Sequence, residues 1–160
     1  MKLEKILEYA LEREYEGKRF FVENAERLQN AAARSAFLAI AAEEQKHIDF
    51  IAAQIAALNA GVTPQQPETP ESAFFADRAE SQNIIDSVAE SMVADLPVLR
   101  MAYLIERDFA EFYQAAAGKA EGQAKEILTM LSRWESGHEK LFKQMHDQAF
   151  EKYAEMPWGG

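Results

Sequence analysis

The second half of this 160-residue chain repeats the first at a nearly constant offset. One stretch recurs 92 positions later, where Ala10, Glu14, Phe20 and Phe21 are matched by Ala102, Glu106, Phe112 and Tyr113. The next recurs 91 positions later, where Ala33, Phe37, Ile40, Glu44, His47 and Phe50 are matched by Ala124, Leu128, Leu131, Glu135, His138 and Leu141. Such a repeat predicts two similar structural units whose equivalent residues meet across a pseudo-twofold axis.

Each unit has the composition of a pair of long helices. Ala, Glu, Leu, Lys and Gln dominate, and β-branched residues are few, which favours helix. We predict helices over 2–28, 31–59, 96–117 and 121–153. Asn30 is a good cap for the second helix, and Gly61 follows its end. Asp95 precedes a Leu-Pro pair that suits the start of the third helix, and Gly118 marks its stop.

The helices are joined by links of very different lengths. Pro64, Pro67 and Pro70 exclude helix interior from the start of the middle connection, whereas residues 73–94 predict one or two short helices. The other two links are only a few residues long, so each pair forms an antiparallel hairpin. We therefore predict a single all-α domain over 1–160: a four-helix bundle with hairpins 2–60 and 96–153, a long crossover 61–95 and a tail 154–160.

Each predicted helix has an apolar stripe that ionisable residues interrupt near its middle. In the first helix the stripe runs through Leu3, Leu7, Ala10, Glu14, Gly17, Phe21 and Leu28, and the other helices follow the same spacing of three and four. The interrupting residues of all four stripes are Glu14, Glu44, His47, Glu106, Glu135 and His138. These six residues are the candidate site.

Carboxylates gathered inside a bundle are costly, because each loses hydration and raises the pKa of its neighbours. Two divalent cations would balance four carboxylates, and two imidazoles would complete the ligand shells. In Glu-x-x-His the two side chains lie about 60° apart and ~4.5 Å along the helix axis. Carboxylate and imidazole ligands suit iron or manganese better than copper(I), and zinc stays an alternative. We therefore predict two divalent metal ions per chain, held by one Glu from each of two helices and Glu-x-x-His from the others.

A lone Glu-x-x-His is a weak signal in a Glu-rich helical protein. Two copies, each about 30 residues after a stripe-facing Glu in a repeated chain, are far more specific. Two other interpretations fit the same residues. In one, the six are surface charges and the stripes are misplaced; in the other, the bundle keeps the ligands but has lost the metal.

These motifs resemble those of the ferritin-like di-iron proteins, and most closely the rubrerythrin-like branch. The resemblance covers both hairpins and rests on Glu14 with Gly17 and Phe20-Phe21, Glu44-Gln-Lys-His47, Glu106 with Phe112-Tyr113, and Glu135-Ser-Gly-His138. It implies terminal ligands at Glu14, Glu106 and both histidines, and bridging ligands at Glu44 and Glu135. It also implies a ferritin-like fold, two iron ions per chain and a cytoplasmic oligomer. The implied activity is an oxidoreductase of ferroxidase or peroxidase type, which oxidises ferrous iron with, or reduces, dioxygen or hydrogen peroxide.

Two departures from that branch shape the functional expectation. The sequence has no cysteine to build a rubredoxin-type iron centre, so a separate electron donor or ferrous iron itself would supply electrons. Phe109 stands where rubrerythrins tend to have a further glutamate, so the six ligands are similar to the ferroxidase centre of bacterioferritin. The alternative function is a non-catalytic iron-binding, delivery or accessory protein.

Charge and cysteine content exclude several other classes. With 27 acidic against 17 basic residues, the net charge is −10, which disfavours nucleic-acid and membrane-surface partners. The absence of cysteine excludes disulfides, zinc-finger ligand sets and thiol nucleophiles. No secretory apolar run begins the sequence and no 18-residue apolar stretch occurs, so we expect no membrane partner and a cytoplasmic location.

Residues beside the six receive simpler interpretations. Tyr113 is expected in the core, Trp134 between helices or at a subunit contact, Glu43 in solvent and His146 at the surface. Phe20, Phe50 and Phe112 exceed what one narrow stripe needs. They indicate a second buried face, hence a homodimer or higher homo-oligomer.

Overall fold

The computed structural model describes residues 2–62 and 89–157. Four long helices account for most of them: α1 (Leu3–Ala25), α2 (Ala31–Asn59), α5 (Leu96–Gly118) and α6 (Gly122–Glu155), with a 3₁₀ helix, η1 (Ala89–Asp95), before α5. The described ranges contain no strand. The predicted all-α bundle is therefore confirmed.

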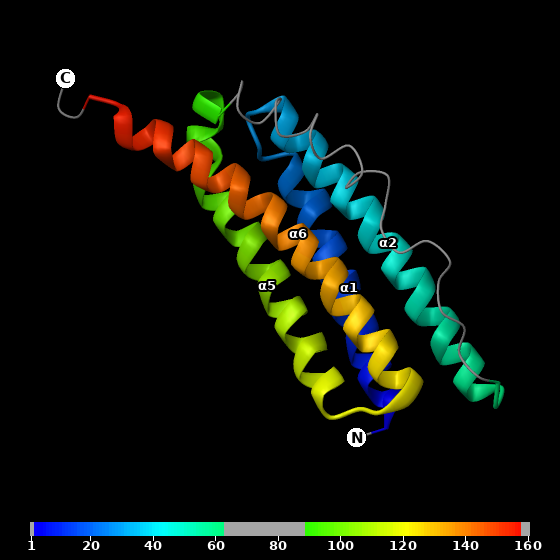
Figure 1. Cartoon of the computed structure of the whole chain (residues 1–160). Helices are drawn as coiled ribbons and strands as arrows, with labels where there is room; N and C mark the ends of the chain where they lie inside the picture. The colour runs from blue at the N-terminus through cyan, green and yellow to red at the C-terminus, as the bar shows by residue number, and fades with distance from the viewer. Residues whose placement is uncertain (1, 63–88, 158–160) are drawn as a thin grey trace.

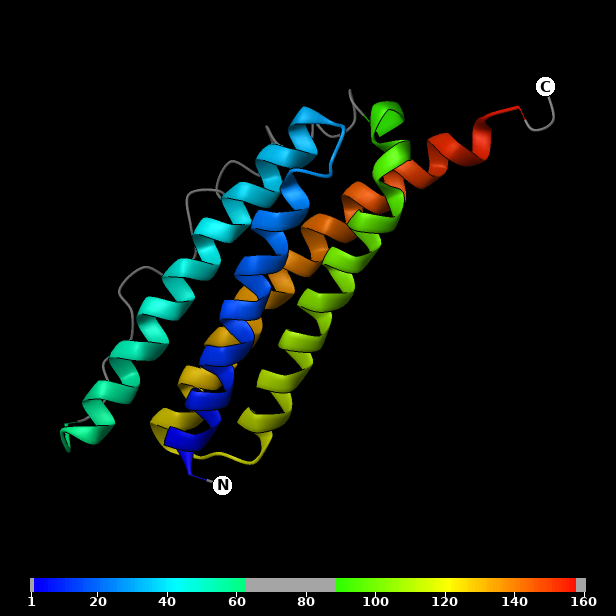
Figure 2. The ribbon, with the colours of Figure 1, turned by 180° about the vertical axis from the view of Figure 1, so that it is seen from behind.

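The four helices form two antiparallel hairpins, α1 with α2 and α5 with α6 (Figure 1). The end of α2 and the beginning of η1 lie at opposite ends of the bundle. Consequently α2 and α5 run in the same direction, as a bundle with one long crossover requires. Viewed from behind, α1 lies between α2 and α5, whereas α6 occupies that place in the front view (Figure 2).

Most helix ends follow the predicted signals. Oδ1 of Asn30 accepts a hydrogen bond from the backbone N–H of Ala33 at 2.9 Å, so it caps α2 as expected. Gly61, just past α2, has φ +70°, a conformation that L side chains rarely adopt. The predicted first helix ended three residues too late, since α1 ends at Ala25 and residues 26–30 form the turn. The side chain of Asp95 does not cap α5 but binds this turn instead.

Two separate apolar clusters fill the bundle, one toward each end. Phe21, Phe37 and Phe142 dominate the first, in which the rings of Phe21 and Phe142 are stacked at 5.2 Å. Leu7, Ile51, Phe109, Tyr113 and Leu131 belong to the second. Between them the helices carry the ionisable residues, so the apolar core is divided by a polar centre.

The three surplus phenylalanines pack within the chain. Phe20 contacts the rings of Phe21 and Phe37, Phe50 contacts Trp134, and Phe112 contacts Tyr9 and Tyr113. All three lie against the core clusters and are partly buried. Intramolecular packing thus accounts for them, and a homo-oligomer stays a prediction.

Some predictions fall on residues outside the described ranges. These include the three prolines of the crossover, most of the short helices expected over 73–94 and the end of the tail. Within the described ranges, no helix is both long enough and apolar enough to cross a lipid bilayer.

Candidate metal centre

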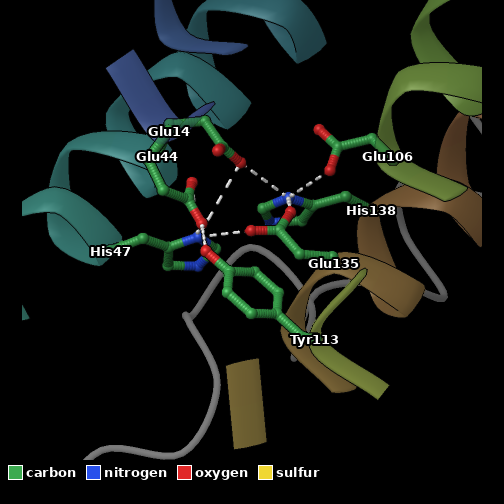
Figure 3. Close-up of polar contacts among 7 residues, drawn as sticks. All are labelled: Glu14, Glu44, His47, Glu106, Tyr113, Glu135 and His138. Atoms are coloured by element: carbon green, nitrogen blue, oxygen red, sulfur yellow. Dashed lines mark hydrogen bonds and ion pairs between the residues drawn. The ribbon is translucent and has the colours of Figure 1, made fainter. Parts of the chain in front are cut away.

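Six ionisable side chains point into one space between the four long helices (Figure 3). α1 and α5 each supply a glutamate, and α2 and α6 each supply a glutamate followed three positions later by a histidine. The residues are Glu14, Glu44, His47, Glu106, Glu135 and His138. All are buried, with at most 3% of their surface exposed. The structure thus brings every member of the predicted ligand set together, and their binding of metal stays a prediction.

Both imidazoles direct Nδ1 toward the carboxylates. His47 Nδ1 lies 2.9 Å from Glu135 Oε1, 3.4 Å from Glu14 Oε2 and 3.9 Å from Glu44 Oε1. His138 Nδ1 lies 3.0 Å from Glu44 Oε1, 3.4 Å from Glu135 Oε2 and 3.5 Å from Glu106 Oε2. Glu44 and Glu135 therefore face both imidazoles, whereas Glu14 and Glu106 each face one.

The six residues form two overlapping groups that could each hold a metal ion. Glu14, Glu44, His47 and Glu135 form one group, and Glu44, Glu106, Glu135 and His138 form the other. Within each group the candidate ligand atoms lie within 4.8 Å of one another. Because Glu44 and Glu135 belong to both groups, each could bridge two ions. Three carboxylates and one imidazole per group suit iron or manganese.

The hydrogen bonding of the carboxylates tests whether a cation fits. Within the described chain, both oxygens of Glu44, both of Glu106 and one each of Glu14 and Glu135 are buried without a partner in hydrogen-bonding geometry. Buried polar atoms normally have such partners, and leaving one without costs about 1–3 kcal/mol. Four of these six oxygens do lie 3.0–3.5 Å from an imidazole Nδ1, but the cluster holds many more buried acceptors than its two imidazoles can satisfy. Folding alone explains this excess of acceptors poorly. They are well explained as oxygens directed at cations, so the residues fit two metal ions.

The glutamates do not share one charge state. Burial raises the pKa of Glu14, Glu44 and Glu106 well above the usual range, and repulsion between the carboxylates raises it further. Burial acts in the same direction at Glu135. There, however, attraction to the imidazole of His47, its hydrogen bond to Oε1 and the nearby imidazole of His138 outweigh burial and hold the pKa of Glu135 well below the usual value. Without metal, Glu135 is therefore the carboxylate most firmly ionised.

The same carboxylates raise the pKa values of the two histidines. Burial alone would lower the pKa of each imidazole, but the neighbouring carboxylates outweigh it. Glu135 and Glu44 raise the pKa of His47, and Glu106 contributes most to the larger rise at His138. Metal binding requires neutral imidazole and ionised carboxylate, so it releases protons from this cluster.

Gly17 leaves room for the centre on the α1 side. A Cβ atom at this position would lie 2.8 Å from Cε2 of Phe109 and 3.6 Å from Oε2 of Glu44. The ring of Phe109 occupies that space, only 4% exposed, and the guanidinium of Arg13 lies 5.0 Å from its centroid. Phe109 occupies the position equivalent to Gly17 in the sequence repeat, so one half of the bundle provides the ring and the other the space.

Tyr113 belongs to the centre as well as to the core. Its hydroxyl donates a hydrogen bond to Oε1 of Glu14 at 2.6 Å, and the residue is 1% exposed. Burial, together with the charge of Glu14, raises the pKa of the phenol well above its usual value. The sequence interpretation as a core residue missed this contact. The sequence did contain a signal for it, because Tyr113 places a hydroxyl at the apolar-stripe position that Phe21 occupies in the first unit.

Trp134 also contacts the centre, which the sequence analysis did not predict. Its ring is stacked on the imidazole of His47, with centroids 4.8 Å apart and planes 16° apart. No periodicity would have indicated this, because the equivalent residue of the first unit is Glu43. Glu43 itself forms an ion pair with Lys46 and its side chain is 12% exposed, so it is less solvated than expected. His146 lies away from the centre, between Tyr103 and Phe150.

Comparison with known families decides the relationship. The rubrerythrin family model matches residues 5–93 and 97–157, which include both hairpins and all six centre residues. The chain belongs to the rubrerythrin family. No curated protein and no solved structure matches it. A ferritin-like bundle that lacks rubredoxin-type cysteines within this sequence agrees with that membership.

Proposed function

We propose that this rubrerythrin-family protein is a non-haem di-iron redox protein, which oxidises ferrous iron with dioxygen or hydrogen peroxide. The observation that carries the proposal is the pair of buried four-residue groups that share Glu44 and Glu135. Those two glutamates would bridge two iron ions. Glu14 with His47 and Glu106 with His138 would complete the two ligand sets.

Ferrous iron is the substrate in this proposal. Two ferrous ions give up one electron each, and with two protons these convert hydrogen peroxide to two waters or dioxygen to hydrogen peroxide. Four carboxylates balance two divalent ions in charge, and their anionic oxygens attract a trivalent ion more strongly than a divalent one. The donor set therefore lowers the energy of the oxidised product relative to the reactant.

The remaining contacts hold the ligands in place. The phenol of Tyr113 fixes one oxygen of Glu14 by its 2.6 Å hydrogen bond, which leaves the other oxygen directed at the centre. Trp134 packs on the ring of His47 and holds its plane. The apolar clusters on either side exclude water, which strengthens every electrostatic interaction between them.

The source of electrons limits what the protein does alone. Sustained peroxide reduction would need electrons returned to iron after each turnover, and the sequence has no cysteine for a rubredoxin-type centre. We therefore expect negligible peroxidase activity with reduced nicotinamide cofactor unless a reductase and an electron carrier are added. Added ferrous iron should be oxidised without them.

Stopped-flow absorbance of ferric iron after mixing with oxygen or peroxide tests the proposal. Wild type should oxidise iron faster than buffer alone, whereas Glu135→Ala and His138→Ala should approach the uncatalysed rate. Glu151→Ala, which removes an exposed carboxylate from the same helix, is the matched control and should behave as wild type. If wild type binds two iron ions but oxidises them at the uncatalysed rate, the protein serves iron binding or delivery instead.

A further inference from the structure

Three aromatic rings form a stack beside the centre. The indole of Trp134 lies 4.8 Å from the imidazole of His47 at 16°, and that imidazole lies 5.4 Å from the imidazole of His138 at 8°. Both separations are within the range of stacked aromatic pairs. The indole is therefore in direct π contact with a proposed ligand of one metal position, and through it with a proposed ligand of the other.

The stack leads from the surface of the bundle to its interior. Trp134 is partly exposed, whereas His47 is 3% and His138 is 1% exposed. Phe50 packs edge-on against the indole at 5.7 Å and 70°, which fixes its plane against His47. The indole thus connects the outer side of the bundle to the buried ligands.

The sequence repeat does not require an aromatic ring here. The residue equivalent to Trp134 in the first unit is Glu43, which pairs with Lys46. The indole therefore makes the two halves of the centre chemically different. Tryptophan and tyrosine are, after cysteine, the side chains most readily oxidised by one electron, and this sequence has no cysteine.

We propose that Trp134 supplies an electron to the oxidant when the chain holds a single ferrous ion. This inference rests on the proposed function. One ferrous ion can give one electron, and one-electron reduction of hydrogen peroxide releases a hydroxyl radical. With a second electron from Trp134, the peroxide O–O bond is cleaved to two waters. The indole loses its Nε1 proton to become a neutral radical, and one further proton comes from solvent, so atoms and charge balance.

Tyr113 is the alternative electron source near the centre. Its hydroxyl is hydrogen-bonded to Glu14 and only 1% of the residue is exposed. The phenol reaches the centre through this hydrogen bond to a carboxylate, whereas the indole of Trp134 is stacked on the imidazole of His47. The geometry therefore favours the indole, and a tyrosine-type radical would identify the phenol instead.

The test uses the whole chain loaded anaerobically with one ferrous ion per chain and mixed with one equivalent of hydrogen peroxide. Freeze-quench electron paramagnetic resonance detects the radical, and a spin trap measures released hydroxyl radical. We expect a tryptophan-type signal in wild type, and its loss in Trp134→Phe with a several-fold rise in trapped hydroxyl radical. Trp158→Phe is the matched control, because it removes the other tryptophan, which lies outside the described residues. It should keep the signal.

Three outcomes would overturn the inference while leaving the proposed function standing. These are iron oxidation in wild type without a tryptophan radical, loss of the signal in Trp158→Phe, and loss of the signal in Tyr113→Phe while Trp134→Phe keeps it. Oxidation of two iron ions per chain in wild type no faster than in buffer would overturn the proposed function, and the inference with it.

Discussion

Oε1 of Glu135 lies 2.9 Å from Nδ1 of His47, although the two residues are 88 positions apart and belong to different hairpins. Glu44 and His138 form the reciprocal pair at 3.0 Å. Each Glu-x-x-His motif therefore directs its glutamate at the histidine of the other motif. These two pairs join the hairpins at the middle of the bundle, between the two apolar clusters.

Metal should stabilise the folded chain, because cations bind the assembled centre better than the unfolded chain. At about 100 times the dissociation constant, one site adds ~2.7 kcal/mol. For a chain of this size that amounts to a rise in Tm of roughly 5–10 °C. Calorimetry at pH 7 with and without ferrous iron, under anaerobic conditions, measures it. Equal melting temperatures would contradict the expectation.

Removing the charge of Glu44 should stabilise the metal-free protein but weaken its binding of metal. Glu44→Gln keeps the shape of the side chain but relieves repulsion among the buried carboxylates. The metal-free variant should therefore melt above metal-free wild type, and it should bind metal more weakly. A lower Tm for the metal-free variant would show that the charge of Glu44 is needed for folding. Glu111→Gln on α5, where the side chain is exposed, is the control.

The metal-free protein should lose stability as the pH rises from about 5 to about 8. Glu14, Glu44 and Glu106 have raised pKa values when folded, so their contribution is complete below the ordinary value and is lost as the pH rises through the folded one. The raised pKa values of both histidines act in the same direction. Glu135 has a lowered pKa and acts oppositely, with stability that is lost as the pH falls.

Thermal melting of metal-free protein in matched buffers across that range measures the balance. Five groups act in the same direction over that range, and Glu135, with a lowered pKa, changes stability only at more acidic pH, so we expect the lower Tm at pH 8. Metal-loaded protein should not follow this trend, because binding requires the deprotonated carboxylates and neutral imidazoles that a higher pH provides. A metal-free protein equally stable at both pH values would show that the raised pKa values do not influence folding.

Tyr113→Phe should weaken the metal-free fold without changing its packing. The variant leaves Oε1 of Glu14 buried without its donor, which costs about 1–3 kcal/mol. Urea denaturation should show a lower midpoint with an unchanged m value. Tyr15→Phe is the matched control, because Tyr15 is 53% exposed and its change should stay within about 0.5 kcal/mol. Equal effects of the two variants would remove the energetic role assigned to the hydrogen bond.

The sequence was sufficient to predict the bundle and the six centre residues for a definite physical reason. A buried stripe must be apolar, so Glu14 or His138 at a stripe position is conspicuous, and the duplication shows the same exception twice. Crossover length then determines which helices run in the same direction. Both signals are spacings along the chain, so they can be read directly from the sequence.

Contacts that depend on side-chain direction across helices were not predictable in this way. Trp134 lies next to Glu135 and off its stripe, yet the indole reaches the imidazole of His47 on another helix. Asp95 stands where a helix cap is expected, yet its carboxylate binds a turn 65 residues earlier. In both cases the contact depends on how one helix packs against another, and such packing leaves no periodic pattern in the sequence.

Gly17→Ala should destabilise the protein, although alanine favours helix by about 1 kcal/mol. The added Cβ would lie 2.8 Å from the buried ring of Phe109, and overpacking costs about 1–3 kcal/mol. Gly118→Ala, with no atom within 4 Å of its Cβ, should be neutral or stabilising. Adding Phe109→Leu should restore part of the stability lost in Gly17→Ala, as measured by a double-mutant cycle. Additive effects would contradict this steric explanation.

Asp95 joins the start of α5 to the turn between α1 and α2. Its carboxylate accepts hydrogen bonds from the backbone N–H groups of Gln29 and Asn30, both at 3.0 Å, and the residue is only 2% exposed. Removing the acceptor in Asp95→Ala leaves the amide of Asn30 buried without this partner. We expect a loss of about 2–4 kcal/mol, because hydrogen bonds to a charged group contribute more than neutral ones.

Hydrogen exchange at the amides of residues 29 and 30 locates that loss. In Asp95→Ala both amides should exchange faster, while the metal stoichiometry stays as in wild type, because Asp95 lies at the end of the bundle beyond one apolar cluster. Asp108→Ala, which removes an exposed carboxylate from α5, is the control and should change stability by no more than about 0.5 kcal/mol. Unchanged exchange at both amides would mean that the helical packing alone holds this turn in place, and that the carboxylate of Asp95 adds nothing to the connection between the hairpins.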